Sequence, residues 1–195
     1  MGRIYCIMGK SASGKDTVYK ELLRRFPELK TYVMYSTRPK REGEQDGVTY
    51  HFVSDEELSA FEKAGKLIEK RVYHTMLGPW TYATVDDGQI DLSAHDYLML
   101  ATPEAYQGIR RYFGTDRVRD IYIEVEDGER LLRAIRREQL EPEPHYDEVC
   151  RRFLADQADF SEEKLREAGI GRHYENEDMG RCVSDIARDM EHDRI

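Results

Sequence analysis

Apolar residues near the start of the chain form a pattern that predicts a strand, a loop and a helix in that order. Residues 4–8 are continuously apolar, as is typical of a strand covered on both faces of a parallel sheet. Residues 15–26 carry apolar side chains at helical spacing, and Pro27 ends that pattern. A continuous apolar strand is predicted at residues 97–101, another strand at residues 118–125, and a last edge strand at residues 172–175. This alternation predicts an α/β fold built on a parallel sheet.

The segment between residues 31 and 85 has a different pattern, in which short runs alternate between apolar and polar positions. Such alternation is typical of strands with one exposed face. Ser54 followed by Glu57 forms a capping box, so a helix is expected to begin there and to end near Gly65. Strands are predicted at residues 31–35, 48–53, 67–73 and 82–85, with a loop through Gly78, Pro79 and Trp80 between the last two. The pattern indicates a β-rich insertion in the α/β fold.

Charged helical patterns follow in the second half of the chain. A basic helix is expected from Asp127 to about Gln139, and two prolines in residues 140–144 interrupt it. A long acidic helix is expected from about Tyr146 to Gly169. Further helices are predicted at residues 87–92, from Pro103 onward, and at residues 179–190.

Composition narrows the possible functions. With 195 residues the chain can bury a sizeable core, which favours one domain with small inserted parts. A net charge of -9 argues against a nucleic-acid partner, because phosphate backbones are captured by basic surfaces. Cys6, Cys150 and Cys182 are far apart and are expected to be reduced thiols. No apolar stretch suits a signal peptide or a membrane span, so a cytoplasmic location without membrane contact is expected.

A glycine-rich stretch directly after the first predicted strand has the composition of a phosphate-binding loop. Glycines let the backbone turn its amide N–H groups inward, Lys15 supplies a cation for the β- and γ-phosphates, and the next helix presents its positive end. Asp16 replaces the usual Ser or Thr, so Asp16 and Thr17 are candidate Mg²⁺ ligands. The alternative is a strand-to-helix turn without a ligand. The predicted ATP-binding loop consists of Gly9, Lys10, Ser11, Ala12, Ser13, Gly14, Lys15, Asp16 and Thr17.

An arginine-rich turn is the second candidate site. Arg38 and Arg41 lie in a turn fixed by Pro39. Two planar guanidinium groups there could bind one phosphate with paired hydrogen bonds, which suits a phosphorylated acceptor. A solvated basic turn is the alternative, and it would be favoured for an isolated pair of arginines. Because a predicted triphosphate-binding loop precedes this turn, a phosphate site is the favoured interpretation.

Three features together resemble the guanylate kinase family: the phosphate loop, Glu69, and the stretch TRPKREGEQDGVTYHFVS from Thr37 to Ser54. The resemblance covers nearly the whole chain. It implies a P-loop three-layer α/β fold with a parallel sheet, a small β-rich GMP-binding insertion and a helical lid. It also implies Mg²⁺-dependent transfer of the γ-phosphoryl group from ATP to GMP or dGMP in purine nucleotide metabolism. The implied parts are a core at residues 1–33, 86–126 and 156–195, the insertion at residues 34–85 and the lid at residues 127–155.

The resemblance also assigns roles to single residues. Glu69 matches the family's carboxylate for guanine, and a carboxylate can accept hydrogen bonds from the N1–H and 2-amino groups of that base. Thr84 falls where the family has a Ser or Thr at the base. Asn176 matches an asparagine near the adenine of ATP, and a turn or cap role for it is equally open. The implied contacts to the GMP phosphate are Arg38, Arg41, Tyr50 and Tyr82. The implied catalytic set is Lys15, Arg38 and the lid arginines Arg133, Arg137 and Arg152.

Three positions depart from the family pattern and keep other functions open. They are Asp16, Met34 in place of a serine that faces guanine, and Thr102 in place of an aspartate below the base. The sequence Gly14-Lys15-Asp16 resembles ribose 1,5-bisphosphate kinases on the same scaffold, so another small phosphorylated acceptor is one alternative. A non-catalytic binding module with a guanylate-kinase-like fold is another, which the complete loop and the lid arginines oppose. The sequence does not predict the oligomeric state.

Overall fold

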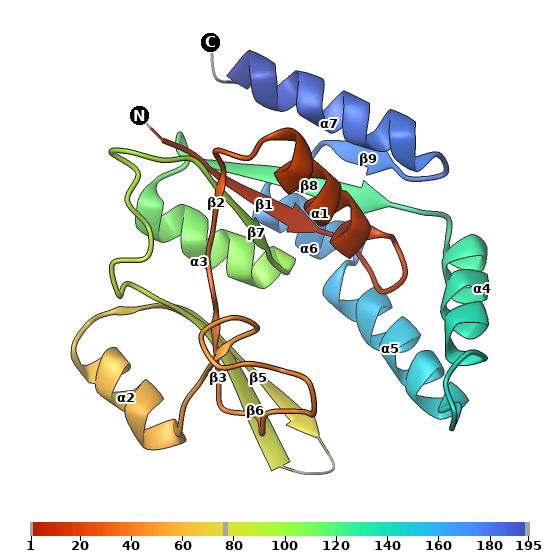
Figure 1. Cartoon of the computed structure of the whole chain (residues 1–195), viewed down its shortest axis with the longest axis horizontal. Helices are drawn as coiled ribbons and strands as arrows, with labels where there is room; N and C mark the ends of the chain where they lie inside the picture. The colour runs from red at the N-terminus through yellow and green to blue at the C-terminus, as the bar shows by residue number, and fades with distance from the viewer. Residues whose placement is uncertain (1, 76–77, 194–195) are drawn as a thin grey trace.

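A five-stranded parallel sheet forms the centre of the computed structural model (Figure 1). The structure describes residues 2–75 and 78–193. Neighbouring strands of this sheet all run in the same direction, as the apolar runs in the sequence predicted. In spatial order the strands are β2 (Lys30–Thr31), β7 (Tyr97–Leu100), β1 (Ile4–Met8), β8 (Val118–Glu124) and β9 (His173–Glu175).

Helices cover both faces of this sheet, because alternate side chains of β1 are buried in opposite directions. Ile4 and Met8 belong to a core with the helices α3 (Pro103–Phe113) and α6 (Glu162–Ala168). Tyr5 and Ile7 belong to a core with α1 (Lys15–Arg25) and α7 (Met179–Asp193). Each fully buried side chain of this size stabilises the fold by roughly 1.5–3 kcal/mol. The predicted three-layer α/β fold is therefore confirmed. The helices are α1 (Lys15–Arg25), α2 (Asp55–Lys63), α3 (Pro103–Phe113), α4 (Asp127–Glu138), α5 (Tyr146–Asp159), α6 (Glu162–Ala168) and α7 (Met179–Asp193).

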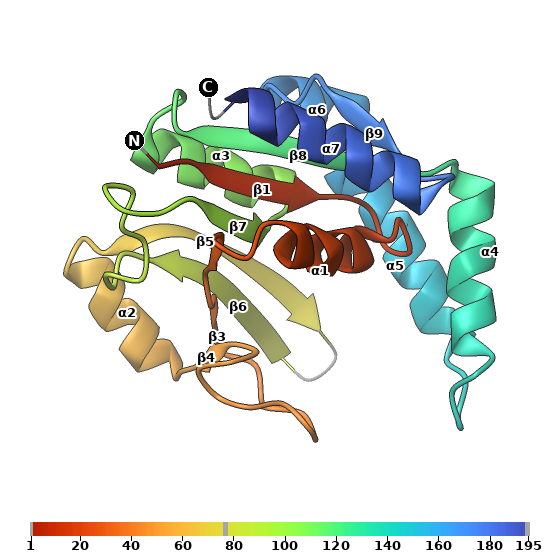
Figure 2. The same cartoon turned by 45° about the horizontal axis from the view of Figure 1, so that its top comes forward.

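A second, smaller sheet lies beside the parallel one (Figure 2). In spatial order its strands are β4 (His51–Phe52), β3 (Tyr35–Ser36), β6 (Gly78–Val85) and β5 (Leu67–Thr75). Helix α2 begins at the predicted capping box, in which Ser54 Oγ accepts from Glu57 N at 3.1 Å and Glu57 Oε2 accepts from Ser54 N at 2.8 Å. Both views place this sheet and the α4–α5 pair on different sides of α1.

Two strand predictions were wrong in extent. Residues 31–35 do not form one strand, because Lys30–Thr31 pairs with β7 in the parallel sheet and Tyr35–Ser36 pairs with β6 in the small sheet. Within the predicted strand at residues 48–53, only His51–Phe52 is paired as a strand. Pairing with a neighbour sets the length of a strand, and the alternating pattern alone does not reveal where the neighbour ends.

The loop predicted around Gly78, Pro79 and Trp80 is also wrong. These residues lie in β6, where Trp80 pairs with Tyr73 and Pro79 pairs with His74. Proline is tolerated because β3 covers β6 only at Tyr82 and Ala83, so Pro79 has a strand partner on one side alone. The part of the predicted loop at residues 76–77 lies outside the described residues.

Two helix predictions failed because short polar side chains bond to nearby backbone. At residues 87–92 no helix forms, since Asp87 Oδ1 accepts from Gln89 N at 3.0 Å and closes a turn. The long acidic helix is divided into α5 and α6. Ser161 begins α6 by accepting a hydrogen bond from Lys164 N at 3.4 Å.

Two further expectations from the sequence were reduced thiols and the lack of a membrane span. All three cysteines are free, and burial together with the charge of Asp120 raises the pKa of the Cys6 thiol. In the described part of the chain, every helix is too short or too polar to cross a bilayer.

Candidate active site

The phosphate loop, residues 9–17, connects the carboxyl end of β1 to α1. Gly14 has φ 84° and caps α1, and a Cβ there would lie 2.5 Å from Asn176 Nδ2. Only glycine fits both the left-handed backbone and this close approach. Ala12 also has a positive φ, 62°, which is strained for a residue with a side chain. The loop is therefore held in a curled conformation against its own preference.

One amide of this curled loop binds an anionic group. Ser11 N donates to Asp156 Oδ2 of α5 at 2.8 Å. Ser13 Oγ is buried and has no hydrogen-bond partner among the described residues. A loop that presents an amide to a carboxylate at the start of a helix can present it equally to a phosphate.

Lys15 and Asp16 lie together at the first turn of α1. Lys15 Nζ is 3.1 Å from Asp16 Oδ2, and the Asp16 side chain is 66% exposed. Among residues 2–75 and 78–193, no group of three or more His, Cys, Asp and Glu side chains could hold a metal ion. A carboxylate and the Thr17 hydroxyl fit Mg²⁺ as oxygen donors, provided that nucleotide and water supply the other ligands.

Asn176 joins the phosphate loop to α4. Its buried side-chain amide donates to Ser13 O at 2.8 Å, and its backbone oxygen accepts from both Nη atoms of Arg133 at 3.2 Å. Arg133 also pairs with Glu129 at 2.9 Å. The predicted contact of Asn176 with adenine stays a prediction, whereas its support of the loop is a direct contact.

Arg130 is a central residue of this region that the sequence analysis missed. Its side chain is 2% exposed and lies over the Phe153 ring at 4.5 Å. Its guanidinium donates to Ser11 O at 3.0 Å and to Asp156 Oδ2 at 3.1 Å. The spacing of Asp127 and Arg130 on one helix was a visible signal, but the contact with Asp156 depends on how α4 and α5 pack.

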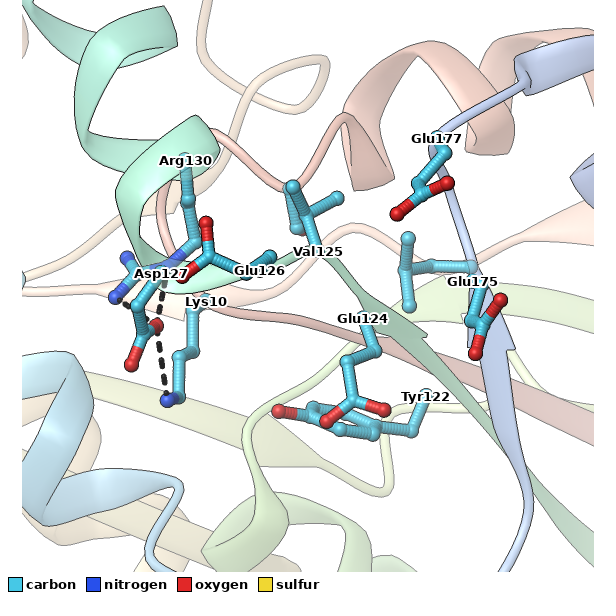
Figure 3. Close-up of a pocket in the computed structure, with 11 residues that line it drawn as sticks. Lys10, Tyr122, Glu124, Val125, Glu126, Asp127, Arg130, Glu175 and Glu177 are labelled. Carbon is cyan, nitrogen blue, oxygen red and sulfur yellow. Dashed lines mark hydrogen bonds and ion pairs between the residues drawn. The ribbon is translucent and has the colours of Figure 1, made fainter.

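A pocket of about 290 Å³ adjoins the loop and is lined by Lys10, Ser13 and the ends of β8 and β9. Figure 3 shows the Asp127 carboxylate between Lys10 and Arg130, with Glu124, Glu175 and Glu177 across the pocket. Lys10 Nζ is 3.3 Å from Asp127 Oδ1 and 2.7 Å from Gln157 Oε1. Burial opposes ionisation of Asp127, but hydrogen bonds from Gln157 and Arg130 and the charge of Lys10 outweigh it and lower the pKa.

The predicted lid arginines occupy two places. Arg137 and Arg152 line a second hollow of about 580 Å³ together with residues at the outer end of the α4–α5 pair. Arg133 instead lies against Asn176, close to the phosphate loop. The structure thus brings Arg137 and Arg152 together but not all three arginines.

Arg38, Tyr50 and Tyr82 meet on the small sheet. The Arg38 guanidinium is centred 5.0 Å from the Tyr50 ring, and the rings of Tyr50 and Tyr82 are 5.6 Å apart. Glu44, which the sequence analysis did not single out, forms two hydrogen bonds with Arg38 at 2.7 and 2.5 Å and accepts from Arg41 N at 2.8 Å. The Arg38 hydrogen bond, together with that of the Arg41 backbone, lowers the pKa of Glu44 to about 2.

Glu69 and Thr84 also meet, as neighbours across β5 and β6. Thr84 Oγ1 donates to Glu69 Oε1 at 2.6 Å, and the Glu69 side chain is only 6% exposed. Arg71 forms an ion pair with Glu69 at 3.0 Å and is likewise buried. Arg71 was not predicted as a site residue, although two residues in alternate positions of a strand share a face.

A parallel sheet, a glycine loop with an inward amide, and a lysine at the start of the next helix define the class of nucleotide-binding α/β proteins. Comparison with known proteins specifies the family. The family model described as guanylate kinase matches residues 1–145. A guanylate kinase of Chlorobaculum tepidum is 30% identical over 190 residues, which cover 95% of this chain and 90% of that protein. The chain belongs to the guanylate kinase family.

Other matches are shorter or more distant. Guanylate kinases of Chlorobium luteolum and Frankia casuarinae are 40% and 44% identical over 73 and 78 residues. The chain spans only 37% and 40% of these two relatives, and the same shares of the chain are matched. A solved guanylate kinase from Anaplasma phagocytophilum matches all of this chain and 87% of its own, with a TM-score of 0.63 and 19% identity. That likeness supports the fold.

Proposed function

We propose that this protein transfers the γ-phosphoryl group of ATP to GMP and releases ADP and GDP. The observation that carries the proposal is the buried Glu69–Thr84 pair on the small sheet of a chain that also holds a complete phosphate loop. A buried carboxylate can accept hydrogen bonds from the N1–H and 2-amino groups of guanine, and adenine lacks this pair of donors. Membership of the guanylate kinase family supports the same acceptor.

In the proposed reaction, the phosphate loop and Lys15 bind the β- and γ-phosphates of ATP. A GMP phosphate oxygen forms the new bond to the γ-phosphorus while the bond to the β–γ bridging oxygen breaks, and ADP leaves. Phosphoryl transfer depends mainly on positioning and on neutralising charge, so the fixed amides and cations carry most of the rate. Mg²⁺ would supply further charge neutralisation, with Asp16 and Thr17 as its protein ligands.

On the acceptor side, Arg38, Arg41, Tyr50 and Tyr82 are proposed to hold the phosphate of GMP. The Arg38 guanidinium lies over two aromatic rings and forms hydrogen bonds with Glu44, so its position is fixed before a ligand binds. A fixed cation loses less conformational entropy on binding phosphate. Thr84 is proposed to support Glu69 at the base.

Residues 127–155, which comprise α4 and most of α5, are proposed to act as the lid, and the small sheet is proposed to act as the acceptor part within residues 34–85. Arg133, Arg137 and Arg152 would then reach the phosphates on closure. The core would comprise residues 1–33, 86–126 and 156–195. A cytoplasmic role in purine nucleotide metabolism stays a prediction.

The proposed function is tested by coupled ADP release with ATP and Mg²⁺, comparing GMP with dGMP, AMP, UMP and ribose 1,5-bisphosphate. Fast turnover confined to GMP and dGMP is expected. Turnover of GMP no faster than that of the other acceptors would contradict the proposal.

A further inference from the structure

A buried arginine lies among the residues proposed to recognise the acceptor base. Arg71 donates to both oxygens of Glu69, from Nε to Oε2 at 3.0 Å and from Nη2 to Oε1 at 3.4 Å. Nη1 donates to Thr102 Oγ1 at 3.2 Å, and Nη2 also lies 3.8 Å from Met34 Sδ. Glu69 comes from the small sheet and Thr102 begins α3 beside the parallel sheet. Arg71 therefore bridges the two sides of the place where Glu69 is expected to meet a base.

Among the neighbours of Arg71, Thr102 and Glu69 already form other hydrogen bonds, whereas Met34 interacts only weakly. Thr102 Oγ1 accepts from Ala105 N at 3.3 Å, which caps α3, and from Arg71. The thioether of Met34 is a weak acceptor and no donor. Arg71 therefore supplies strong hydrogen-bond donors beside Glu69.

Burying the ion pair of Arg71 and Glu69 is costly for folding. Their side chains are 8% and 6% exposed, so both charges have lost most of their hydration. A buried ion pair commonly contributes little net stability, because desolvation offsets the attraction. A chemical task at the site accounts better for a pair at this position than stability does.

Recognition of guanine is such a task. Guanine presents the N1–H and 2-amino donors beside the O6 and N7 acceptors, and a guanidinium is the side chain that most often binds O6 and N7. The O6 acceptor of guanine lies next to its N1–H donor, so the two side chains that bind them must also be neighbours. Arg71 Nε lies 3.0 Å from the Glu69 carboxylate. Adenine has an amino group where guanine has O6. Its N–H donors would face the N–H donors of Arg71, which disfavours adenine.

We propose that Arg71 is a specificity-determining residue whose guanidinium donates hydrogen bonds to the O6 edge of guanine while Glu69 accepts from N1–H and the 2-amino group. The proposal rests on the proposed phosphorylation of GMP. It explains how a chain with Met34 and Thr102 at two base-facing positions keeps a donor for O6.

The test compares three acceptors in the wild-type protein and in Arg71→Met. The acceptors are GMP, IMP, which lacks the 2-amino group, and 2-aminopurine riboside monophosphate, which lacks O6 and also the N1–H that Glu69 accepts. A charged hydrogen bond is worth about 10- to 100-fold in kcat/KM, so the wild-type preference for GMP over the 2-aminopurine nucleotide is expected to fall by about that factor in Arg71→Met. The preference for GMP over IMP, which depends on Glu69, is expected to persist.

Other outcomes separate the possible failures. Parallel loss of both preferences would overturn the proposal, because Arg71 would then only position Glu69. Unchanged preferences would overturn it too. A wild-type protein that neither binds nor phosphorylates GMP would overturn the proposed function, and this inference with it.

Two further variants keep the test decisive if Arg71→Met folds poorly. Arg71→Lys retains the charge beside Glu69 but loses the planar fork, so a smaller fall in the same preference is expected, and an unchanged preference would contradict the proposal. Lys70→Met is the matched control, because Lys70 is exposed on the other face of β5 and pairs with Glu62 at 2.7 Å. Folding of each variant is checked by circular dichroism.

Discussion

At the scale of single residues, the acceptor side is organised by charge pairs that exist before a ligand binds. Arg38 is 5% exposed, and Glu44 holds it with two hydrogen bonds. An ion pair that is fixed on both sides by hydrogen bonds and rings is less dynamic than an exposed one. Glu44 therefore determines where the Arg38 guanidinium points.

Replacing Glu44 by Gln is expected to change the pH dependence of stability. The folded pKa of Glu44 is about 2, below the ordinary value of 4.5, so its ionised form stabilises the fold fully above pH 4.5 and this contribution is lost as the pH falls toward 2. The wild-type protein should be the more stable near neutral pH, and its advantage should vanish in acid. Urea denaturation at several pH values measures this difference. Glu42→Gln, an exposed change in the same turn, is the control; a constant difference for Glu44→Gln would contradict the argument.

Lys15 is the residue whose loss should affect chemistry most directly. In Lys15→Ala, kcat is expected to fall by about 10²- to 10³-fold, because a cation that meets the transferred group is removed. Lys20→Ala alters an exposed lysine of the same helix and should leave kcat near the wild-type value. Steady-state kinetics with ATP and GMP measures both, and an unchanged kcat in Lys15→Ala would refute the proposed mechanism.

Residue types in sequence predicted part of the site. Arg38, Tyr50 and Tyr82 were expected together and lie together, and so do Glu69 and Thr84. The contact of Asp156 with Ser11 could not be predicted, because it joins two segments that are far apart along the chain and depends on helix packing. The contact of Arg130 with Asp156 was missed for the same reason, whereas Arg71 shares a strand face with Glu69 and could have been found from the sequence.

At the scale of elements, the close packing of α3 against β5 fixes the base site. A Cβ at Gly108 of α3 would lie 2.5 Å from Glu69 Cβ. No other residue type allows the helix and the strand to approach so closely. Gly108 is thus a condition for the position of Glu69.

Gly108→Ala is expected to push α3 and β5 apart and to displace Glu69. Since a displacement of about 1 Å can reduce rates by up to about 100-fold, kcat/KM for GMP should fall strongly while KM for ATP stays unchanged. Kinetics with each nucleotide varied in turn measures the two effects. Gly171→Ala is the control, because a Cβ at Gly171 meets nothing within 4 Å. Equal changes for both nucleotides would argue against a local displacement.

Elements with a strong local signal were predicted well. The Ser54 capping box and the apolar run of β1 each determine their own conformation, and both were found as expected. Elements in which side chains compete for backbone amides were predicted poorly. The Asp87 side chain closes a turn where a helix was expected, and the Ser161 side chain starts a new helix where one long helix was expected.

At the scale of the whole molecule, the described contacts of α4 and α5 with the phosphate loop lie near one end of the helix pair. Arg130 and Asp156 contact Ser11 near that end, whereas Arg137 and Arg152 line a hollow at the outer end. An element held at one end can pivot about its attachment. The attachment also places the pivot directly beside the proposed triphosphate site.

Binding of both nucleotides is therefore expected to make the molecule more compact. Small-angle X-ray scattering with GMP and a non-hydrolysable ATP analogue should give a smaller radius of gyration than the ligand-free protein, because the outer arginines must approach the phosphates. Each nucleotide alone serves as the comparison. Superimposable profiles in all four states would speak against closure.

The division of residues 31–35 between two sheets has a mechanical consequence. Three residues, 32–34, join β2 of the parallel sheet to β3 of the small sheet, and three residues reach at most about 10 Å. The Tyr32 hydroxyl is further tied to Val85, from which it accepts a hydrogen bond at 2.7 Å. So short a tether keeps the small sheet from sliding away from the parallel sheet, which holds a bound acceptor within a fixed reach of residues 32–34.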